Sequence, residues 1–398
     1  MSFSPSTDPP YITLYLPNLD GGGAERMMVN LAHGFLECGA RVDLVLAAAR
    51  GPYLNQVKPD IRIIDLTSPG VFASLPKLVR YLHRQRPDAL LTTLNHASVV
   101  ALLARRLAGV PTRVINRESN MLFPGTVHSL KRKILREAVR RTYPWADAHI
   151  AVSQGVAEDL QRFVPLPSER VFTIYNPVVT DTLQEKARAP LEHPWFNEGE
   201  PPVILGVGRL APQKDFPTLI RAFAEMRRKR PVRLVILGEG GERGALEALV
   251  TELGIAADVD LPGFVDNPFA YMARAHLFVL SSRFEGLPGV LIQAMACGCP
   301  VVATDCPSGP SEVLAGGQYG PLVPVGDAAA LAEAMTKTLA APPPREKLQG
   351  RAADFSEQAT VPRYLEVLLP PHRLAALRHR QAPEHPPTDS ARVETVNR

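Results

Sequence analysis

The sequence predicts an α/β protein built from two doubly wound parallel sheets that face each other across a cleft. Short apolar runs without polar alternation recur along the chain and alternate with helical periodicity, a pattern typical of parallel strands buried on both faces. The pattern starts at Tyr11, stops near Asn176 and restarts at Val203. A length of 398 residues also fits two domains better than one core.

The first half carries the predicted strands Tyr11–Pro17, Arg41–Ala47, Ile61–Leu66, Asp88–Leu94, Arg113–Asn116 and Ala148–Val152. The apolar spacing of Met27, Met28, Leu31 and Phe35 predicts a helix between the first two strands, and a second helix is expected near Val71–Arg86. We expect residues 1–176 to form the first domain, followed by a linker or irregular segment at 177–202.

The second half repeats the pattern, with predicted strands Val203–Gly208, Arg233–Gly238, Val259–Leu261, His276–Leu280 and Pro300–Thr304. Helices are predicted at Asp215–Arg230 (with Asp215 as its cap), Gly244–Leu253, Asp327–Leu339 and Phe355–Leu369. We expect a second domain over 203–354. Residues 370–398 are Pro-rich and polar, and we predict that they are mostly disordered.

Composition excludes several classes of protein. No apolar run approaches the roughly 20 residues that cross a bilayer, and we expect no signal peptide at the N-terminus. The four cysteines suit free thiols in a cytosolic protein, and no His/Cys spacing predicts a metal site. Up to Asn176 the chain has 21 basic and 14 acidic residues, which favours an anionic partner on that side. No nucleic-acid module is present, so we expect no nucleic-acid partner.

The most informative segment is Ser282–Leu314, which places the carboxylate of Glu285 in a Gly/Pro loop that opens a helix. Gln293 follows near the second turn. The first amides of a helix have no intrahelical partner and the macrodipole is positive there, so this loop predicts a phosphate site. Glu285 and Gln293 would then bind hydroxyls beside the phosphate.

Two cations follow the first strand of the second half, within Gly206–Phe216. Ligands bind at this position in doubly wound sheets, so Arg209 and Lys214 would hold a diphosphate and stabilise it as it gains charge on leaving. A solvated loop with two surface cations is an equally good interpretation of this segment alone.

Other polar or glycine-rich loops follow the strands of the first half. Asp20–Arg26 has three glycines that permit close approach to a phosphate or sugar, but its spacing misses the dinucleotide fingerprint. His96 and Arg117 follow later strands at the predicted cleft edge. His96 is as well explained by a structural role as by a catalytic one, and Arg117 and Glu118 either pair with each other or line an acceptor pocket.

The stretch Val127–Trp145 has six basic residues against the single acid Glu137. Its apolar stripe (Val127, Leu130, Ile134, Ala138) is expected to pack on the core while the cations rest on anionic lipid headgroups. A solvated basic face is the alternative.

Together these motifs resemble the GT-B-fold retaining glycosyltransferases of family four, from about Ile12 to about Leu369. The resemblance depends on the order of GGGAER, VGRLAPQKDF, FEGLPGVLIQAMACGCPVVATD and SGPSEVL. It implies two Rossmann-like domains, and transfer of a sugar from a nucleotide diphosphate, with uridine favoured, without a metal or a bound cofactor. It also implies that the helix at 355–369 crosses back onto the first domain. The acceptor would be a glycan or a lipid-linked glycan of surface-polysaccharide assembly, at the cytoplasmic face of the inner membrane.

The resemblance also implies roles for individual residues. Arg209 and Lys214 would bind the diphosphate, Glu285 the sugar hydroxyls and Gln293 the ribose, and His96 would lie near the reacting sugar. The backbone would make further contacts with the nucleotide-sugar. Gly22 and Gly23 would approach it from the first domain, and the base would lie near Gly263, Phe264 and Val265. The diphosphate would lie near Gly286, Leu287, Pro288, Gly289 and Val290. Gln293 departs from the family signature, which has a second glutamate there.

Three other functions remain open from sequence. A nucleotide-sugar epimerase would need no acceptor, and a non-catalytic nucleotide-sugar-binding protein is motivated by Gln293. A dehydrogenase is disfavoured because the second strand ends without the acidic ribose-binding residue of the fingerprint.

Overall fold

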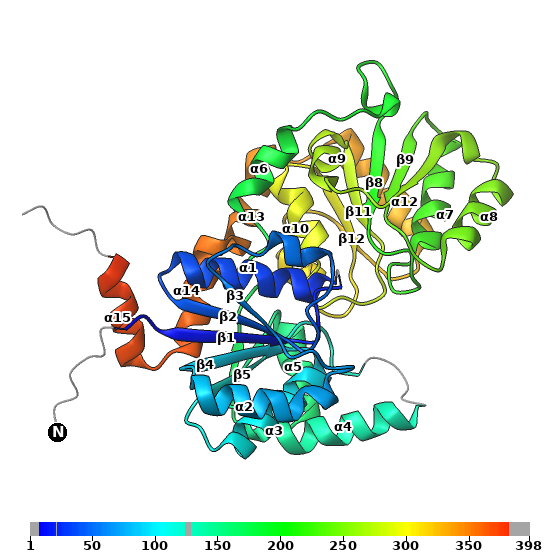
Figure 1. Ribbon diagram of the computed structural model, residues 1–398. Helices are drawn as coiled ribbons and strands as arrows, with labels where there is room; N and C mark the ends of the chain where they lie inside the picture. The colour runs from blue at the N-terminus through cyan, green and yellow to red at the C-terminus, as the bar shows by residue number, and fades with distance from the viewer. Residues whose placement is uncertain (1–7, 21, 124–128, 382–398) are drawn as a thin grey trace, which may run out of the picture.

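The computed structural model describes residues 8–20, 22–123 and 129–381. It contains two parallel sheets, one in each half of the chain, with helices on both faces of each sheet (Figure 1). The predicted doubly wound architecture is confirmed.

The first sheet has the strand order β3-β2-β1-β4-β5-β6-β7, and every pair is parallel. Its strands are β1 (Tyr11–Leu16), β2 (Arg41–Leu46), β3 (Arg62–Asp65), β4 (Ala89–Thr93), β5 (Arg113–Glu118), β6 (Ala148–Ala151) and β7 (Val171–Thr173). The sequence missed β7, because this three-residue edge strand has no buried side chain and therefore no apolar run.

The second sheet has the order β10-β9-β8-β11-β12-β13 and is also parallel. Its strands are β8 (Val203–Val207), β9 (Arg233–Leu237), β10 (Val259–Gly263), β11 (Leu277–Leu280), β12 (Val301–Thr304) and β13 (Leu322–Val323). The two-residue edge strand β13 was also missed. In both sheets the strand order reverses beside the first strand, between β1 and β4 and between β8 and β11.

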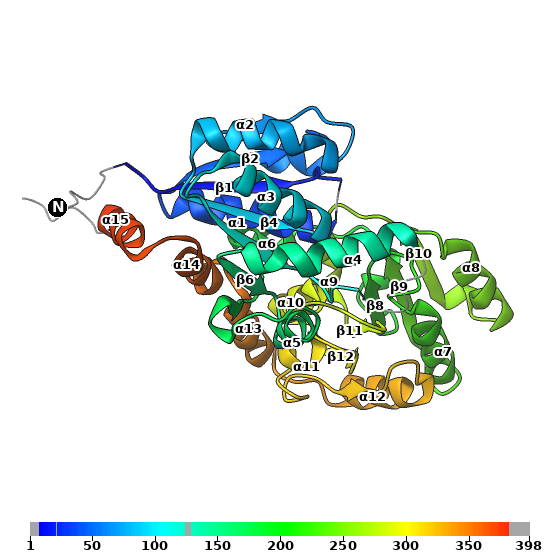
Figure 2. The same ribbon diagram turned by 90° about the horizontal axis from the view of Figure 1, so that it is seen from below.

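Helices cover the two faces of the first sheet differently. One face packs on α2 (Leu75–Gln85), α3 (Asn95–Ala108) and α4 (Leu130–Thr142), and the opposite face packs on α1 (Gly23–Glu37). Figures 1 and 2 show α2, α3 and α4 side by side as one layer. A further helix, α5 (Gln154–Phe163), follows β6.

The stripe predicted on α4 does not pack as expected. Leu130 is 71% exposed and Ile134 is 62% exposed, because α4 packs on the core through Leu135, Ala138 and Val139. Val127 lies outside the described residues.

The second sheet packs on α7 (Phe216–Arg227), α8 (Arg243–Glu252) and α12 (Ala328–Ala340) at one face, and on α9 (Pro268–Arg274), α10 (Gly289–Ala296) and α13 (Arg345–Ala352) at the other. A short helix, α11 (Pro310–Val313), follows β12. The described residues also form 3-10 helices at Pro52–Gln56, Phe72–Ser74, Tyr143–Trp145, Ser168–Arg170, Pro194–Phe196, Ala256–Asp258 and Ala353–Phe355.

The segment predicted as irregular at 177–202 contains a helix, α6 (Asp181–Arg188). It forms because Leu183 and Ala187, four residues apart, are both buried against the second domain next to α9. Just before it, the amides of Val178 and Val179 donate to the carbonyl of Phe355 at 2.9 and 3.1 Å. The two chain segments that connect the domains are thus hydrogen-bonded to each other.

The helix α14 (Glu357–Leu368) packs on α1, and its Tyr364 and Leu368 belong to the core of the first domain. The prediction of disorder after residue 370 is wrong for α15 (Pro371–Gln381), which follows α14 in Figure 1. Leu377 is buried in the same core, and Arg373 pairs with Asp88 at 2.5 Å. Residues 382–398 lie outside the described residues.

As far as the structure describes them, all helices are too short or too polar to span a bilayer.

The packing of α14 against α1 is tight enough to be tested by substitution. A Cβ at Gly34 of α1 would lie 2.5 Å from Cγ2 of Val361 on α14, and valine has little rotamer freedom with which to yield. We expect Gly34→Ala to lower the free energy of unfolding by about 1–3 kcal/mol through overpacking. Chemical denaturation measures this loss, and Val361→Ala in the same chain should restore part of it.

Gly350→Ala is the matched control, because Gly350 lies in α13 with no atom within 4 Å of an added Cβ. It should be neutral or stabilising. Equal stability of the Gly34→Ala and Gly350→Ala proteins would show that the packing of α14 on α1 is looser than the structure indicates.

Candidate functional site

The polar residues predicted from sequence follow the strands at which the sheet order reverses. Gly22 and Gly23 follow β1 and His96 follows β4, whereas Arg209 and Lys214 follow β8 and Glu285 follows β11. Crevices form at such positions, outside the carboxyl ends of parallel strands. The two crevices face each other, since a Cβ at Gly286 would lie 2.2 Å from the carbonyl oxygen of Ser119 in the first domain.

The centre of the site is an ion pair between Lys214 and Glu285. Nζ of Lys214 donates to Oε1 of Glu285 at 2.5 Å, and the hydroxyl of Ser282 donates to the same oxygen at 2.7 Å. The side chains are only 17% and 9% exposed. Burial of two charges is costly unless they are paired and hydrogen-bonded, so these contacts fix both groups in place.

Backbone contacts hold together the two loops that carry this pair. Nε2 of Gln213 donates to the carbonyl of Phe284 at 2.9 Å, and the amide of Arg283 donates to the carbonyl of Gln213 at 2.8 Å. The hydroxyl of Ser281 donates to the carbonyl of Lys214 at 2.7 Å. The loops after β8 and β11 are therefore one rigid unit.

Asp215 precedes α7 as predicted, but its side chain does not cap the helix. The residue has φ +49°, in the left-handed region, and its carboxylate pairs with Arg283 at 3.2 Å instead. The predicted cap is wrong, and the carboxylate of Asp215 instead braces the loop that carries Glu285.

Arg209 is exposed and makes no hydrogen bond or ion pair with the described residues. Its loop packs against the glycine-rich segment after β9. A Cβ at Gly238 would lie 2.0 Å from the carbonyl oxygen of Gly208, and one at Gly240 would lie 2.2 Å from that of Leu210. These glycines are therefore required for the position of Arg209, a role that their spacing alone did not reveal.

The loop Gly286–Val290 leads into α10, which begins at Gly289. Gln293 lies in the second turn of that helix, nearly buried, and its side chain has no hydrogen-bond partner within the described parts of the chain. The ring of Phe264 is exposed at the end of β10, Gly263 adopts φ +90° there, and Val265 packs on the core.

On the first domain, Gly22 is the N-cap of α1 and Gly23 its first residue. A Cβ at Gly23 would meet no atom within 4 Å, so the space in front of it is open. Gly21, the first glycine of the motif, lies outside the described residues.

His96 is the second residue of α3 and lines a hollow of about 270 Å³ at the ends of β4 and β5. Burial lowers the pKa of His96, so its imidazole is neutral at pH 7. The hollow is lined by Leu94, Asn95, His96, Glu118, Ser119, Asn120, Met121, Leu122, Phe123, Arg132 and Leu135.

Arg117 does not line this hollow, and its prediction as a substrate-binding residue is wrong. It is fully buried and donates to Asn176 at 2.5 Å, to Tyr364 at 3.2 Å and to Thr93 at 3.4 Å. Since side chains alternate along a strand, Arg117 points to the face covered by α14, opposite its neighbour Glu118. Its role is to tie α14 and the start of the linker to the first sheet.

Comparisons with known proteins identify this arrangement. The family model "Glycosyl transferases group 1" matches residues 190–355, and "Glycosyltransferase Family 4" matches residues 21–182. The chain belongs to glycosyltransferase family 4. It is therefore a glycosyltransferase with the GT-B fold, as the resemblance implied.

Two curated relatives illustrate the family. One is the N-acetylgalactosamine-N,N'-diacetylbacillosaminyl-diphospho-undecaprenol 4-alpha-N-acetylgalactosaminyltransferase of Campylobacter jejuni, 33% identical over 78% of this chain and 85% of the relative. The other is the lipopolysaccharide core biosynthesis glycosyltransferase LpsE of Rhizobium meliloti, 29% identical over 87% of this chain and 96% of the relative.

Solved structures share the fold. The lipopolysaccharide outer core galactosyltransferase WaaB has a TM-score of 0.69 at 21% identity, and the match covers 89% of this chain and 98% of WaaB. Anabaena HepE in complex with UDP has a TM-score of 0.67 at 21% identity, covering 93% and 98% of the two chains.

The glycosyltransferase also has polar contacts across its crevice that sequence reasoning did not assign. The carboxylate of Glu312, after β12, accepts hydrogen bonds from the first amides of α5, Gln154 at 2.9 Å and Gly155 at 3.1 Å. Beside it, the hydroxyls of Ser153 and Ser308 lie 2.6 Å apart. These residues form an interdomain clasp, and the only sequence signal for it was an acid in a Gly/Pro/Ser loop.

Proposed function

We propose that this glycosyltransferase moves a sugar from a nucleotide-diphosphate-sugar, with UDP as the nucleotide, to a glycan or lipid-linked acceptor with retention of anomeric configuration. One observation carries the proposal. The ammonium of Lys214, in the loop after β8, is held by Glu285, in the loop after β11 that leads into α10. The relative from Campylobacter jejuni and Anabaena HepE, which was solved with UDP, support the donor and acceptor classes.

In this proposal the diphosphate lies between the unpaired guanidinium of Arg209, the ammonium of Lys214 and the amides of Gly286–Val290. Cations and helix amides stabilise a phosphate most when it gains charge. Glu285 binds the hydroxyls of the donor sugar, and Gln293 binds the ribose. The backbone of Gly263–Val265 binds the base, and the open space at Gly23 admits the donor to the first domain.

The acceptor hydroxyl attacks the anomeric carbon on the face from which the diphosphate leaves. The bond from that carbon to the diphosphate oxygen breaks, a bond to the acceptor oxygen forms, and the acceptor's proton passes to the departing phosphate. Arg209 and Lys214 neutralise the developing negative charge, which is the task of a metal in other phosphate-transfer sites. We therefore propose a metal-independent reaction, with His96 beside the reacting sugar.

An epimerase and a non-catalytic binding protein remain distinguishable by product. An epimerase alters the donor sugar without an acceptor, and a binding protein transfers nothing. Neither alternative gains support from the family, whose members named above are transferases.

We further propose that the chain works in surface-polysaccharide assembly at the cytoplasmic face of a membrane. The layer of α2, α3 and α4 carries eleven Lys and Arg residues and one acid, Glu137. Four large apolar side chains on or beside it are exposed: Phe72, Leu107, Leu130 and Ile134. Cations with exposed apolar side chains favour an anionic lipid surface.

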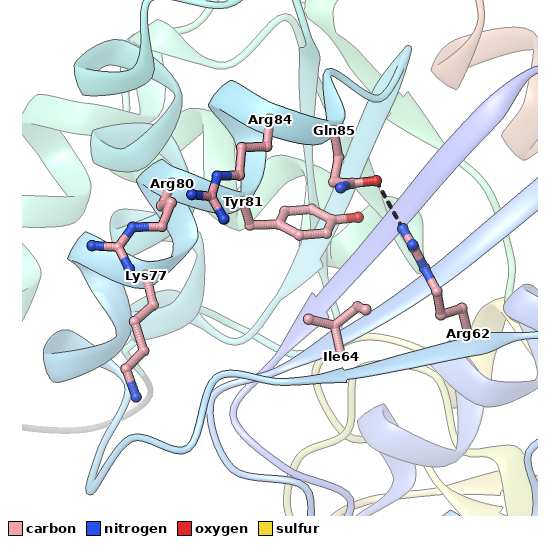
Figure 3. Close-up of a pocket in the computed structure, with 7 residues that line it drawn as sticks. All are labelled: Arg62, Ile64, Lys77, Arg80, Tyr81, Arg84 and Gln85. Carbon is pink, nitrogen blue, oxygen red and sulfur yellow. Dashed lines mark hydrogen bonds between the residues drawn. The ribbon is translucent and has the colours of Figure 1, made fainter.

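A hollow at the edge of this layer is lined by three of its cations, Lys77, Arg80 and Arg84. It lies between α2 and β3 and is lined by Arg62, Ile64, Lys77, Arg80, Tyr81, Arg84 and Gln85 (Figure 3). Arg62 is paired with Asp43, whereas Arg80 and Arg84 make no ion pair within the described chain.

The first prediction concerns Lys214. We expect Lys214→Ala to lower turnover with a UDP-sugar by roughly 100- to 1,000-fold, because it removes a cation that stabilises the leaving group. A product assay with a panel of nucleotide-sugars and polyprenyl-diphosphate-linked acceptors measures this, and the unfolding temperature reports whether the fold survives. Arg221→Ala, at an exposed cation of α7, should leave turnover unchanged. Wild-type turnover in Lys214→Ala would refute the assignment.

The second prediction concerns Gln293, where the family has glutamate. A charged acceptor strengthens a hydrogen bond to a hydroxyl, so Gln293→Glu should tighten UDP binding by about 1 kcal/mol, or roughly fivefold. Isothermal titration with UDP measures the change. Gln161→Glu, on the exposed side of α5, controls for added charge. Unchanged affinity in Gln293→Glu would show that this side chain does not reach the ribose.

The third prediction concerns the membrane. The triple variant Lys131→Gln, Lys133→Gln, Arg140→Gln should weaken binding to phosphatidylglycerol vesicles by roughly 100-fold, since each cation near such a surface contributes about 1 kcal/mol. Vesicle co-sedimentation measures the binding, and phosphatidylcholine vesicles should bind neither protein. Removal of three exposed cations from the second domain, at Arg221, Arg228 and Lys229, is the control. Equal losses in both triples would contradict a specific surface.

A further inference from the structure

A row of buried polar side chains lies between the first sheet and the layer of α2, α3 and α4. Thr92 on β4, Asn116 on β5 and His149 on β6 are register neighbours, so they share one face of the sheet. Ser98 of α3 and Tyr143 lie against them from the helical side. The hydroxyl of Tyr143 interacts with Ser98 and Glu118, whereas Thr92, Asn116 and His149 each have a buried polar atom without a hydrogen-bond partner among the described residues.

Glu118 ends this row, two residues after Asn116 and therefore on the same face. The residue is only 2% exposed, its carboxyl group lies beside the hydroxyl of Tyr143, and Oε1 makes no well-aligned hydrogen bond within the described structure. A buried carboxyl group that is incompletely hydrogen-bonded is costly, so a carboxylate in this position points to a ligand or to a special role. Glu118 is also one of the residues that line the hollow beside His96.

The hollow lies directly against the donor loop of the other domain. Ser119, which follows Glu118, approaches Gly286 so closely that a Cβ there would lie 2.2 Å from its carbonyl oxygen. One wall of the hollow is therefore next to the loop at which the diphosphate is proposed to bind. Its other walls come from the start of α3 and from Leu135 of α4.

We propose that Glu118 is the acceptor-orienting residue of this enzyme, and that its carboxyl group accepts a hydrogen bond from a hydroxyl of the acceptor sugar seated in the hollow. The proposal rests on the proposed transfer reaction and adds a residue to it. A sugar hydroxyl in the hollow adds a donor to a carboxyl group beside which the described residues place the hydroxyl of Tyr143, and the polar row behind Glu118 lets ordered waters continue the network.

The chemistry of the buried carboxyl agrees with this geometry. Burial raises the pKa of Glu118 to about 7, with Asp159 raising it further and Tyr143 and Arg117 lowering it. Arg117 points to the opposite face of the sheet, and no ion pair of Glu118 is found among the described residues. An acceptor hydroxyl stabilises the charged form, and the same contact fixes which hydroxyl faces the donor.

The test compares Glu118→Gln with Glu158→Gln, which changes an exposed glutamate on α5. Transfer from a UDP-sugar to a polyprenyl-diphosphate-linked acceptor is measured together with hydrolysis of the same donor by water and with UDP affinity. We expect Glu118→Gln to raise the acceptor KM or lower transfer by roughly 10- to 100-fold, because a hydrogen bond to a charged group is lost. Donor hydrolysis and UDP affinity should stay within twofold of wild type.

Two outcomes overturn the inference. Wild-type transfer by Glu118→Gln would show that the carboxyl does not meet the acceptor, and a parallel loss of donor hydrolysis would place its effect on the donor or on the fold. If Glu118→Gln does not fold, Leu135→Trp fills the hollow from its rim on α4. Loss of transfer with intact hydrolysis then supports the proposal, and unchanged transfer overturns it.

Failure of the proposed function gives a different result. In that case the wild-type enzyme transfers nothing, and binding of a panel of octyl glycosides is followed by saturation-transfer NMR. Glycoside binding by wild type that is lost in Glu118→Gln would keep the hollow as a sugar site, whereas equal signals from both proteins would reject it.

Discussion

The architecture of the site depends on one buried ion pair, between Lys214 and Glu285. Neither charge is stable in the crevice alone, because desolvation of an isolated ion costs far more than a surface pair contributes. The pair joins the loops after β8 and β11, the two strands at which the second sheet reverses its order. The pair thus fixes the ammonium that we propose to bind the diphosphate, and it holds the two loops together without a ligand.

The close approach of the two domains imposes a second constraint. Gly286 contacts the backbone of Ser119, and Gly155 faces Ser308 so closely that a Cβ would lie 2.9 Å from its side chain. At these two interdomain contacts any residue larger than glycine would clash. In the clasp, the carboxylate of Glu312 accepts hydrogen bonds from the first amides of α5 in the opposite domain. A negative charge is favourable at a helix N-terminus. The contact that joins the two domains therefore also provides hydrogen-bond acceptors for the first amides of α5.

Sequence predicted those parts of the fold that depend on burial from both sides. Central strands such as β1 and β8 appear as continuous apolar runs, whereas the edge strand β7 has no buried residue and β13 has only two residues, so neither leaves such a pattern. The helices α6 and α15 were missed for a related reason. Each buries only a few side chains on a surface supplied by distant parts of the chain, and a Pro-rich polar segment does not reveal that surface.

The limits of sequence are clearest at the neighbouring residues Arg117 and Glu118. Both follow the same apolar run, and the pattern favours either as a cleft residue. Strand alternation turns Arg117 to the face covered by α14, where Asn176, Thr93 and Tyr364 accept its hydrogen bonds, and turns Glu118 to the opposite face. The helix α14, some 240 residues later in the chain, covers the face with Arg117 and leaves the hollow on the face with Glu118. The arginine therefore stabilises the domain junction, and the glutamate is buried beside the hydroxyl of Tyr143 at the wall of the hollow.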